Sequence, residues 1–303
     1  MPGLMLLDTP SLYFRAFYGV PESVTAPDGM PVNAVRGLID MIATLVRIHS
    51  PGGLVACMDF DWRPAFRVAA IPSYKAHRVA SGDQEQIPDA LAPQVPVIEE
   101  VIDAVGVARV GVPGFEADDV IGGCAARADG PVEIVTGDRD LFQLVDDARS
   151  CRVLYTVRGI RNLQIVDEAA ITTRYGIPGR AYADFATLRG DPSDGLPGVP
   201  GIGDKTAAAL VTRFGSLEAI LAALDEGRAE GFPAGSRTRL AAARDYLRVA
   251  PAVVRVALDT PLPDFDPALP SEPRDPATLA GLGARYGLDG PLSRLLAALG
   301  SAQ

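Results

Sequence analysis

The chain has 303 residues, of which 48% are hydrophobic, so it can bury one large core or two smaller ones. A net charge of −10 argues at first against a nucleic-acid partner, and three widely spaced cysteines match neither a disulfide framework nor a zinc site. The sequence holds no signal peptide and no apolar run of about 18 residues, so we expect a cytoplasmic protein without a membrane segment.

Four short apolar segments predict strands: residues 4–7, 54–58, 107–112 and 132–136. Between the first two, an amphipathic segment over 12–18 carries Arg15, and apolar residues at helical spacing predict a helix over 32–49. Strands that alternate with helices are typical of a doubly wound, mostly parallel α/β sheet.

Acidic residues follow the carboxyl end of each predicted strand: Asp8, Asp59, Glu116, Asp118, Asp119, Asp138 and Asp140. Ligands bind outside the carboxyl ends of parallel strands, so we expect these side chains to converge on one edge of the sheet. Glu116 and Asp119 stand three residues apart at the start of an apolar run, which places both on one face of a helix. Taken alone, the acids also fit a helix N-terminus that favours negative charge, followed by an acidic turn.

Carboxylates gathered at one edge need cations, because two of them about 4 Å apart repel by roughly 1 kcal/mol in water and about 4 kcal/mol at an intermediate dielectric. Ligand sets made only of oxygen suit Mg²⁺ or Mn²⁺ rather than zinc. Two such ions about 4 Å apart are a standard apparatus for phosphodiester hydrolysis. A haloacid-dehalogenase-type phosphatase is the main acid-based rival, but it needs Asp-x-Asp after the first strand, where this chain has Asp8-Thr9-Pro10.

The chain contains two lysines, Lys75 and Lys205, while its other basic residues apart from two histidines are arginines. Lys75 lies between Asp59 and Glu116 in a basic, helix-tending stretch that also holds Arg67, Tyr74 and Arg78. An ordinary solvated face is one interpretation of this stretch. We favour the other, in which it contacts phosphates and stacks on bases.

After about residue 170 the composition changes, and Asp191 and Asp194 add two more acids before a glycine-rich segment over 196–206. Backbone N–H groups at the start of the helix that follows can bind a phosphate, and Lys205 adds a positive charge. The segment therefore predicts a helix–hairpin–helix clamp on the DNA backbone, formed by Gly198, Gly201, Gly203, Lys205 and Thr206.

A set of motifs covers the chain from about Leu4 through the hairpin, and more loosely to the C-terminus: Leu7-Asp8 with Arg15-Ala16-Phe17, Asp59, Phe66-Arg67, Ser73 to Arg78, Glu116 to Gly122, Thr136 to Asp140, and Gly190-Asp191 to Thr206. Together they resemble the 5′-nuclease (flap endonuclease) family, most closely the 5′→3′ exonuclease domain of bacterial DNA polymerase I. Taken together, these motifs are highly specific.

The resemblance implies roles for these residues. One metal site would be held by Asp8, Asp59, Glu116 and Asp118, and the other by Asp118, Asp138, Asp140 and Asp194, with Asp119 and Asp191 as outer or water-mediated partners. Lys75 and Arg78 would touch the scissile phosphate from a helical arch, assisted by Arg15, while Arg67 and Tyr74 contact DNA.

The resemblance also implies an architecture and a substrate. We expect a PIN-like nuclease core over 1–168 with the arch at about 64–95, and a helix–hairpin–helix subdomain over 169–303 whose last segment packs back on the core. The expected activity is that of a 5′→3′ exonuclease and flap endonuclease on DNA, and on RNA–DNA primers, in replication and repair. The expected cofactors are two or more Mg²⁺ or Mn²⁺ ions, with K⁺ at the hairpin, in a monomer.

The chain departs from the family pattern at three places. Thr9 and Pro10 replace Gly and Ser after the first strand, Gly195 stands where Asn is usual, and 79–83 lacks the usual prolines, which predicts a looser arch. A catalytically inactive DNA-binding relative is the competing class, and the complete acid set argues against it. The nine candidate ligand acids nearly account for the net charge of −10, so the charge does not exclude a DNA substrate.

Overall fold

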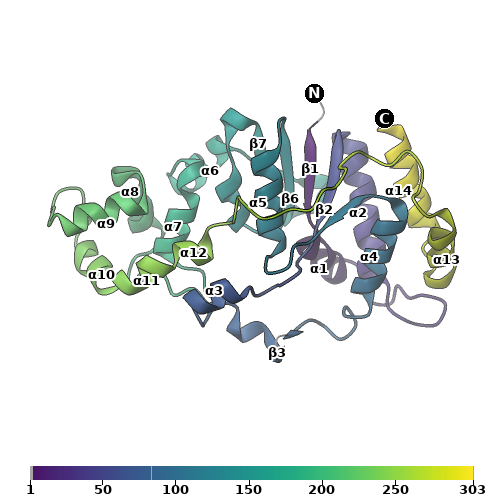
Figure 1. The fold of residues 1–303 in the computed structure, drawn as a ribbon, viewed down its shortest axis with the longest axis horizontal. Helices are drawn as coiled ribbons and strands as arrows, with labels where there is room; N and C mark the ends of the chain where they lie inside the picture. Colours follow the sequence, from purple (N-terminus) through teal and green to yellow (C-terminus); the bar gives the residue numbers. More distant parts are fainter. Residues whose placement is uncertain (1–2, 83, 303) are drawn as a thin grey trace.

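A mostly parallel sheet forms the centre of the molecule, and the computed structural model describes residues 3–82 and 84–302 around it (Figure 1). Within these residues the sheet has six strands in the order β5–β2–β1–β6–β7–β8, and only β7 and β8 pair antiparallel. The strands are β1 (Leu4–Asp8), β2 (Gly53–Cys57), β5 (Ala108–Val110), β6 (Val132–Thr136), β7 (Cys151–Tyr155) and β8 (Gln164–Val166). The predicted doubly wound α/β fold is confirmed, although β7 and β8 were not predicted.

Side chains of β1 alternate between two cores, one on each face of the sheet. Leu6 packs into the core that includes α5 (Ala117–Arg127), while Met5 and Leu7 pack into the other. That second core is built from α1 (Thr9–Gly19), α2 (Asn33–His49), α4 (Gln94–Val105), α13 (Pro276–Tyr286) and α14 (Asp289–Ser301). Helices on both faces leave the carboxyl edge of the sheet as the free place for a site.

The strand order reverses direction between β1 and β6. From β1 the chain proceeds to β2 and β5 on one side, and later to β6 and β7 on the other. In open α/β sheets the crevice at such a switch point is where ligands bind. Asp8 ends β1 and Asp138 follows β6, so two of the predicted acids flank this point.

The segment predicted as a helical arch contains little helix, which corrects that prediction. It holds α3 (Ala65–Ala70), a 3-10 turn η1 (Ala76–Arg78) and a small antiparallel hairpin of β3 (Val79–Ser81) and β4 (Gln84–Glu85). Pro72 follows the end of α3 and Lys75 adopts a left-handed φ of 48°, so a continuous helix cannot pass through them. Asp83, part of the stretch predicted to be loose, lies outside the described residues.

Beyond β8 the chain is helical, and its elements extend away from the sheet (left in Figure 1). They are α6 (Glu168–Tyr175), α7 (Tyr182–Arg189), α8 (Asp204–Phe214), α9 (Leu217–Asp225), α10 (Ser236–Ala242), α11 (Arg244–Val249) and α12 (Pro251–Val254). No single described helix is long and apolar enough to cross a membrane; α8 and α9 would pass that test only as a pair, and they meet at an 81° bend.

An extended segment over 255–275, which we call the strap, leads from α12 back across the sheet to α13 and α14 (Figure 1). The strap pairs antiparallel with the first residues of β2, where the Leu54 N–H donates to the Pro267 carbonyl at 2.7 Å. Further along, the Asp275 N–H donates to the carbonyl of Ala104 on α4 at 2.9 Å. After the strap, α14 packs on α2 as part of the second core.

Candidate functional site

The carboxyl edge of the sheet opens into a cavity of about 540 Å³. Six of the nine predicted ligand acids line it: Asp8, Asp59, Glu116, Asp118, Asp138 and Asp191. Lys75 and Arg78 from the arch segment line the same cavity. The structure therefore brings together acids from four strand ends, a later loop and two cations, as the alternation of strands and helices predicted.

Asp8 is the most constrained of these acids, because it is buried between β1 and β6. Its carboxylate accepts hydrogen bonds from the Thr136 hydroxyl at 2.5 Å and from the Ser11 N–H at 3.2 Å, and it caps the start of α1. The pKa of Asp8 is raised to about 7, first by burial and then by the nearby charges of Asp138 and Asp59, although the Thr136 hydrogen bond lowers it in part. A cation in the cavity would relieve this cost.

The start of α5 supplies the next acids. Glu116 and Asp119 form a capping box there, in which each side chain accepts from the other residue's backbone N–H. Asp59 accepts the Ala117 N–H at 2.7 Å, so the end of β2 is tied to the same helix start. The pKa of Asp118 is raised well above its usual value by burial first, then by the charges of Asp8 and Asp138.

The remaining acids belong to two turns. Asp138 is exposed and accepts the Asp140 N–H at 2.8 Å, and burial raises the pKa of Asp140, with Asp138 adding to the shift. In the loop after α7, Asp191 lies 3.6 Å from Arg189 and Asp194 lies 2.8 Å from Arg78. Asp140 and Asp194 do not line the cavity themselves, but each contacts a residue that does, Asp138 and Arg78 respectively.

Glu116 is surrounded by donors. Its Oε1 pairs with the Lys75 ammonium, while its Oε2 accepts from the Tyr74 hydroxyl at 2.7 Å and from Arg67 Nη1 at 2.6 Å. Burial raises the pKa of Glu116, although Lys75 and Arg67 lower it in part. Burial has the largest single effect and alone would lower the pKa of Lys75, but Glu116 and the other negative groups nearby together outweigh it, and the pKa is raised. Lys75 therefore stays charged beside the acids.

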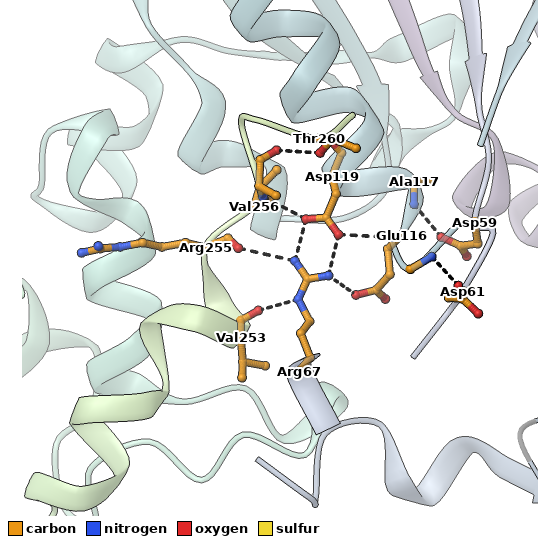
Figure 2. A network of polar contacts seen from close by, with 12 residues as sticks. Asp59, Asp61, Arg67, Glu116, Ala117, Asp119, Val253, Arg255, Val256 and Thr260 are labelled. Carbon is orange, nitrogen blue, oxygen red and sulfur yellow. Dashed lines mark hydrogen bonds and ion pairs between the residues drawn. The ribbon is translucent and has the colours of Figure 1, made fainter. Parts of the chain in front are cut away.

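Arg67 is the centre of a buried network shown in Figure 2, which corrects its predicted role as a DNA contact. Only 3% of its side chain is exposed, and its two terminal nitrogens, Nη1 and Nη2, each donate to the Asp119 carboxylate at 2.7 Å. Its Nε donates to the carbonyl of Val253 on α12 at 3.0 Å. Tyr74 is likewise buried, at 4% exposure, so it cannot stack on a base. Both residues position Glu116 instead.

Asp119 belongs to this network rather than to the metal-facing acids. Besides Arg67, it accepts the Ala257 N–H of the strap at 2.9 Å, and its backbone carbonyl accepts from the Thr260 hydroxyl at 2.8 Å (Figure 2). Asp119 is fully buried, so the expectation of an outer metal partner gives way to a structural anchor.

Arg15 does not line the acidic cavity, contrary to the role expected for it. It borders a second cavity of about 700 Å³ with Arg36 and Arg161, beside the exposed ring of Tyr18. None of the three arginines forms an ion pair within residues 3–82 and 84–302. Asp40 also lines this cavity, but it pairs with Arg294 at 2.7 Å, so the cavity carries more positive than negative charge in a chain that is acidic overall.

The predicted hairpin residues lie apart from the acidic cavity, between α7 and α8. Gly198 and Gly201 adopt left-handed φ angles of 63° and 79°, and Gly203 is the N-cap of α8. Gly203 has no side chain to cap the helix, so the first N–H groups of α8 stay open to a ligand. Lys205 is exposed in that first turn, where it was predicted to be.

The donor chemistry of the acidic cavity fits hard divalent cations, although the acids do not enclose one as they stand. The cavity lining contains no cysteine or histidine, and its predicted ligands are carboxylates from separate elements. Among the described residues, no three acidic, histidine or cysteine side chains are gathered tightly enough to hold a metal ion. Binding would therefore draw carboxylates away from partners they now have, such as Lys75 on Glu116.

Several cavity residues were not predicted from the sequence. Trp62, Glu85, Arg139, Arg174 and Ser193 also line the cavity. Arg139 lies inside the Gly-Asp-Arg-Asp motif and could have been found from it, whereas Arg174 comes from the last turn of α6 and carried no local signal.

Comparisons with family models cover most of the chain. A model described as 5′-3′ exonuclease, N-terminal resolvase-like domain, matches residues 3–176, and one described as 5′-3′ exonuclease, C-terminal SAM fold, matches residues 177–276. The two models meet eight residues after the division we predicted at 168.

Full-length relatives carry the same description. A 5′-3′ exonuclease of Streptomyces coelicolor is 64% identical over 300 residues, covering 97% of this chain and 99% of that protein. A 5′-3′ exonuclease of Mycobacterium tuberculosis is 51% identical, covering 98% and 97%. DNA polymerase I of Mycobacterium tuberculosis is 42% identical over 231 residues, which are 75% of this chain and 25% of that polymerase.

Solved structures share the fold at low identity. The bacteriophage T5 5′-exonuclease with bound zinc matches at a TM-score of 0.66 and 16% identity, covering 99% of this chain and 100% of that chain. A variant of the phage flap endonuclease, solved with DNA and metal ions, matches at a TM-score of 0.66 and 17% identity, covering 98% and 99%.

Proposed function

This chain belongs to the 5′-3′ exonuclease family and is a 5′-3′ nuclease, and we propose that it hydrolyses DNA phosphodiesters at 5′ ends and 5′ flaps with two divalent metal ions. One observation carries the proposal: carboxylates from four strand ends and a later loop converge on one cavity together with Lys75 and Arg78. Acids alone would repel a phosphate, so the cavity requires cations to accept an anionic substrate.

We propose Mg²⁺ or Mn²⁺ as these cations, held by the carboxylates of Asp8, Asp59, Glu116, Asp118 and Asp138, with Asp140, Asp191 and Asp194 as direct or water-mediated partners. The structural neighbours described above were solved with divalent metal ions, which supports the choice of class. Such a pair of ions would activate the attacking water and stabilise charge on the leaving oxygen.

The protein's own cations would hold the scissile phosphate. Lys75 carries its charge on a flexible stem and now rests on Glu116, from which it can swing to a phosphate oxygen. Arg78 is already fixed at the rim by Asp194 and by the Ser193 carbonyl, both at 2.8 Å. These two groups would bind and orient the phosphate over the acids.

Two further surfaces suit the rest of a branched substrate. The open N–H groups of α8 and Lys205 would hold the backbone of one duplex, with K⁺ bound by backbone carbonyls of the hairpin. Arg15, Arg36 and Arg161 have no carboxylate partners in the described part of the chain and would hold phosphates of a second segment, as a flap junction requires. RNA–DNA primers, a monomeric state and a cytoplasmic location belong to the same proposal.

A catalytically inactive DNA-binding relative is the alternative. The experiment is cleavage of a 5′-flap oligonucleotide, labelled at its 5′ end, with Mn²⁺, with Mg²⁺ and with EDTA. We expect release of the labelled flap with either metal and none with EDTA, and no release by the Asp138→Asn variant. Binding of the substrate without cleavage under all conditions would favour the inactive relative.

A further inference from the structure

The root of the arch segment is docked on the loop that follows α7. The Lys75 N–H donates to the Asp194 carbonyl at 2.9 Å, and the Ser73 hydroxyl donates to the Gly195 carbonyl at 2.8 Å. Arg78 adds its two contacts to Ser193 and Asp194 on the same loop. Four hydrogen bonds thus join residues 73–78 to residues 193–195, more than 110 positions apart in sequence. We call this contact the latch.

The loop side of the latch is rigid in itself. Asp191 and Leu196 exchange backbone hydrogen bonds of 3.0 and 2.9 Å, which close the loop, and the Asp191 carboxylate accepts the Ser193 N–H at 2.9 Å. At its base, a Cβ added to Gly198 would lie 2.4 Å from the Arg189 carbonyl oxygen, so the two backbones are in direct contact. A closed loop on a packed base gives the arch a fixed surface to rest on.

Gly195 is the residue that permits the contact. A Cβ added at this position would lie 2.1 Å from the Ser73 carbonyl oxygen, and its φ of 71° is left-handed. The obstacle is backbone rather than a flexible side chain, so it could be avoided only if the arch root moved away. We propose that Gly195 is a positioning residue, which holds Lys75 and Arg78 over the acidic cavity by letting the arch root seat on this loop.

The backbone of Lys75 adopts a left-handed conformation at the latch. Lys75 is one of three non-glycine residues with positive φ among the described residues, and its N–H is bonded across the latch. Such a conformation is strained and persists only where surrounding contacts impose it. Its side chain then leaves the latch toward Glu116, so the loop determines where the ammonium starts.

The test of catalytic effect compares Gly195→Ala with Gly176→Ala, and it rests on the proposed function. Gly176 has the same φ of 71° and a ψ of 23°, against 21° at Gly195, but nothing lies within 4 Å of an added Cβ. Both variants carry the same backbone strain, and only the first displaces the arch root. We expect Gly195→Ala to lower the single-turnover rate about 10–10²-fold with little change in KM, and Gly176→Ala to leave it near wild type.

A double-variant cycle shows whether Gly195 acts through Lys75. If it does, Gly195→Ala should have a much smaller effect in a Lys75→Ala background, because one of the two groups it positions is gone. Equal fold-losses in both backgrounds, or equal effects of the two glycine variants, would overturn the proposal.

A readout without activity keeps the latch distinguishable from the nuclease proposal. Amide hydrogen exchange of the peptide containing Lys75 should be slow in wild type and in Gly176→Ala, and fast in Gly195→Ala. Fast exchange in wild type would refute the latch whatever the enzyme does. Slow exchange in a wild-type protein that cleaves nothing would refute the nuclease proposal and leave the docked arch root established.

Discussion

The Lys75 ammonium has two roles: it neutralises Glu116 in this structure, and it is also placed to bind a substrate phosphate. A compact charge on a flexible stem can pass from one to the other, whereas a planar guanidinium is bound to a fork of acceptors. This explains why a lysine stands here in a chain whose basic residues are otherwise nearly all arginines.

Lys75→Ala should lower single-turnover cleavage of a 5′ flap by about 10²–10³-fold, because it removes a preorganised cation from the developing charge. Binding, titrated in Ca²⁺ to block cleavage, should weaken much less, since the hairpin and the arginines remain. Lys75→Arg should restore only part of the rate. If Lys75→Ala cuts at nearly the wild-type rate, this stretch is an ordinary solvated basic face.

The raised pKa of Asp8 predicts a pH dependence of stability in the metal-free protein. The folded pKa of about 7 lies above the ordinary value of 3.8, so the folded state binds the extra proton. This contribution is complete below about pH 4 and is lost as the pH rises through 7, with a slope of at most about 1.4 kcal/mol per pH unit for one group.

Urea unfolding in EDTA at pH 5.5, 7 and 8 measures this slope. Stability should fall across the series, and Asp8→Asn should flatten it. Stability that rises with pH in EDTA would contradict the shift.

At the residue scale, the sequence predicted that the acids gather at one edge of the sheet, but it did not predict that two neighbouring residues are buried. The acids follow strand ends, and the parallel sheet alone brings them to one edge. Arg67 and Tyr74 looked like DNA contacts because a basic stretch is ordinarily exposed. Arg67 is buried where it donates to the carbonyl of Val253, a residue 186 positions later, and no local pattern could reveal that contact.

At the element scale, the start of α8 combines an uncapped helix terminus with an exposed lysine. Helix and lysine differ in what they offer a phosphate, because the helix provides directed N–H groups and the lysine provides charge. Charge alone governs the dependence on salt, so the two can be separated by experiment.

Lys205→Ala should weaken duplex binding to a similar degree for all sequences and reduce the slope of log K against log salt by about one unit. Fluorescence anisotropy over a salt series, in Ca²⁺, measures both quantities. A matched variant of an exposed arginine on α13, at the other end of the molecule from the hairpin (Figure 1), Arg285→Ala, should leave the slope unchanged. Loss confined to particular sequences would mean that the hairpin reads bases.

The prediction of helices and strands succeeded where a local apolar pattern marks the element, and it was wrong where the chain turns. The four predicted strands are present, but β7 and β8 were overlooked, and the arch is mostly turns and a hairpin. Pro72 and the left-handed Lys75 break the helical pattern that the basic stretch had indicated. The departure at Gly195 likewise has its reason in a backbone contact with Ser73, which only the folded structure brings together.

At the scale of the whole molecule, the Arg67 network joins the arch segment, α5, α12 and the strap (Figure 2). Arg67→Ala would leave Asp119 buried and unpaired, so we expect the free energy of unfolding to fall by about 3–5 kcal/mol. Arg109→Ala removes a pair that is largely exposed, with Asp103, and should cost about 0–1 kcal/mol. Chemical denaturation compares the two, and equal losses would show that the network adds nothing beyond a surface pair.

Metal should stabilise the whole protein, because the ions bind carboxylates that are gathered only in the folded state. Millimolar Mg²⁺ or Mn²⁺ should raise the melting temperature measured by calorimetry, and Asp138→Asn should reduce that rise. An unchanged melting curve on adding either metal would count against a shared site at the sheet edge.

The return of the strap also sets an order for biosynthesis. The core on the α2 face is completed by α14, whose first residue, Asp289, follows the end of α2 at His49 by 240 positions. At a ribosomal speed of about 5–20 residues per second, this apolar surface waits roughly 10–50 s for its partner. A message truncated after α12 would yield a protein whose second core lacks α13 and α14, so that the surface of α2 that α14 covers would stay exposed.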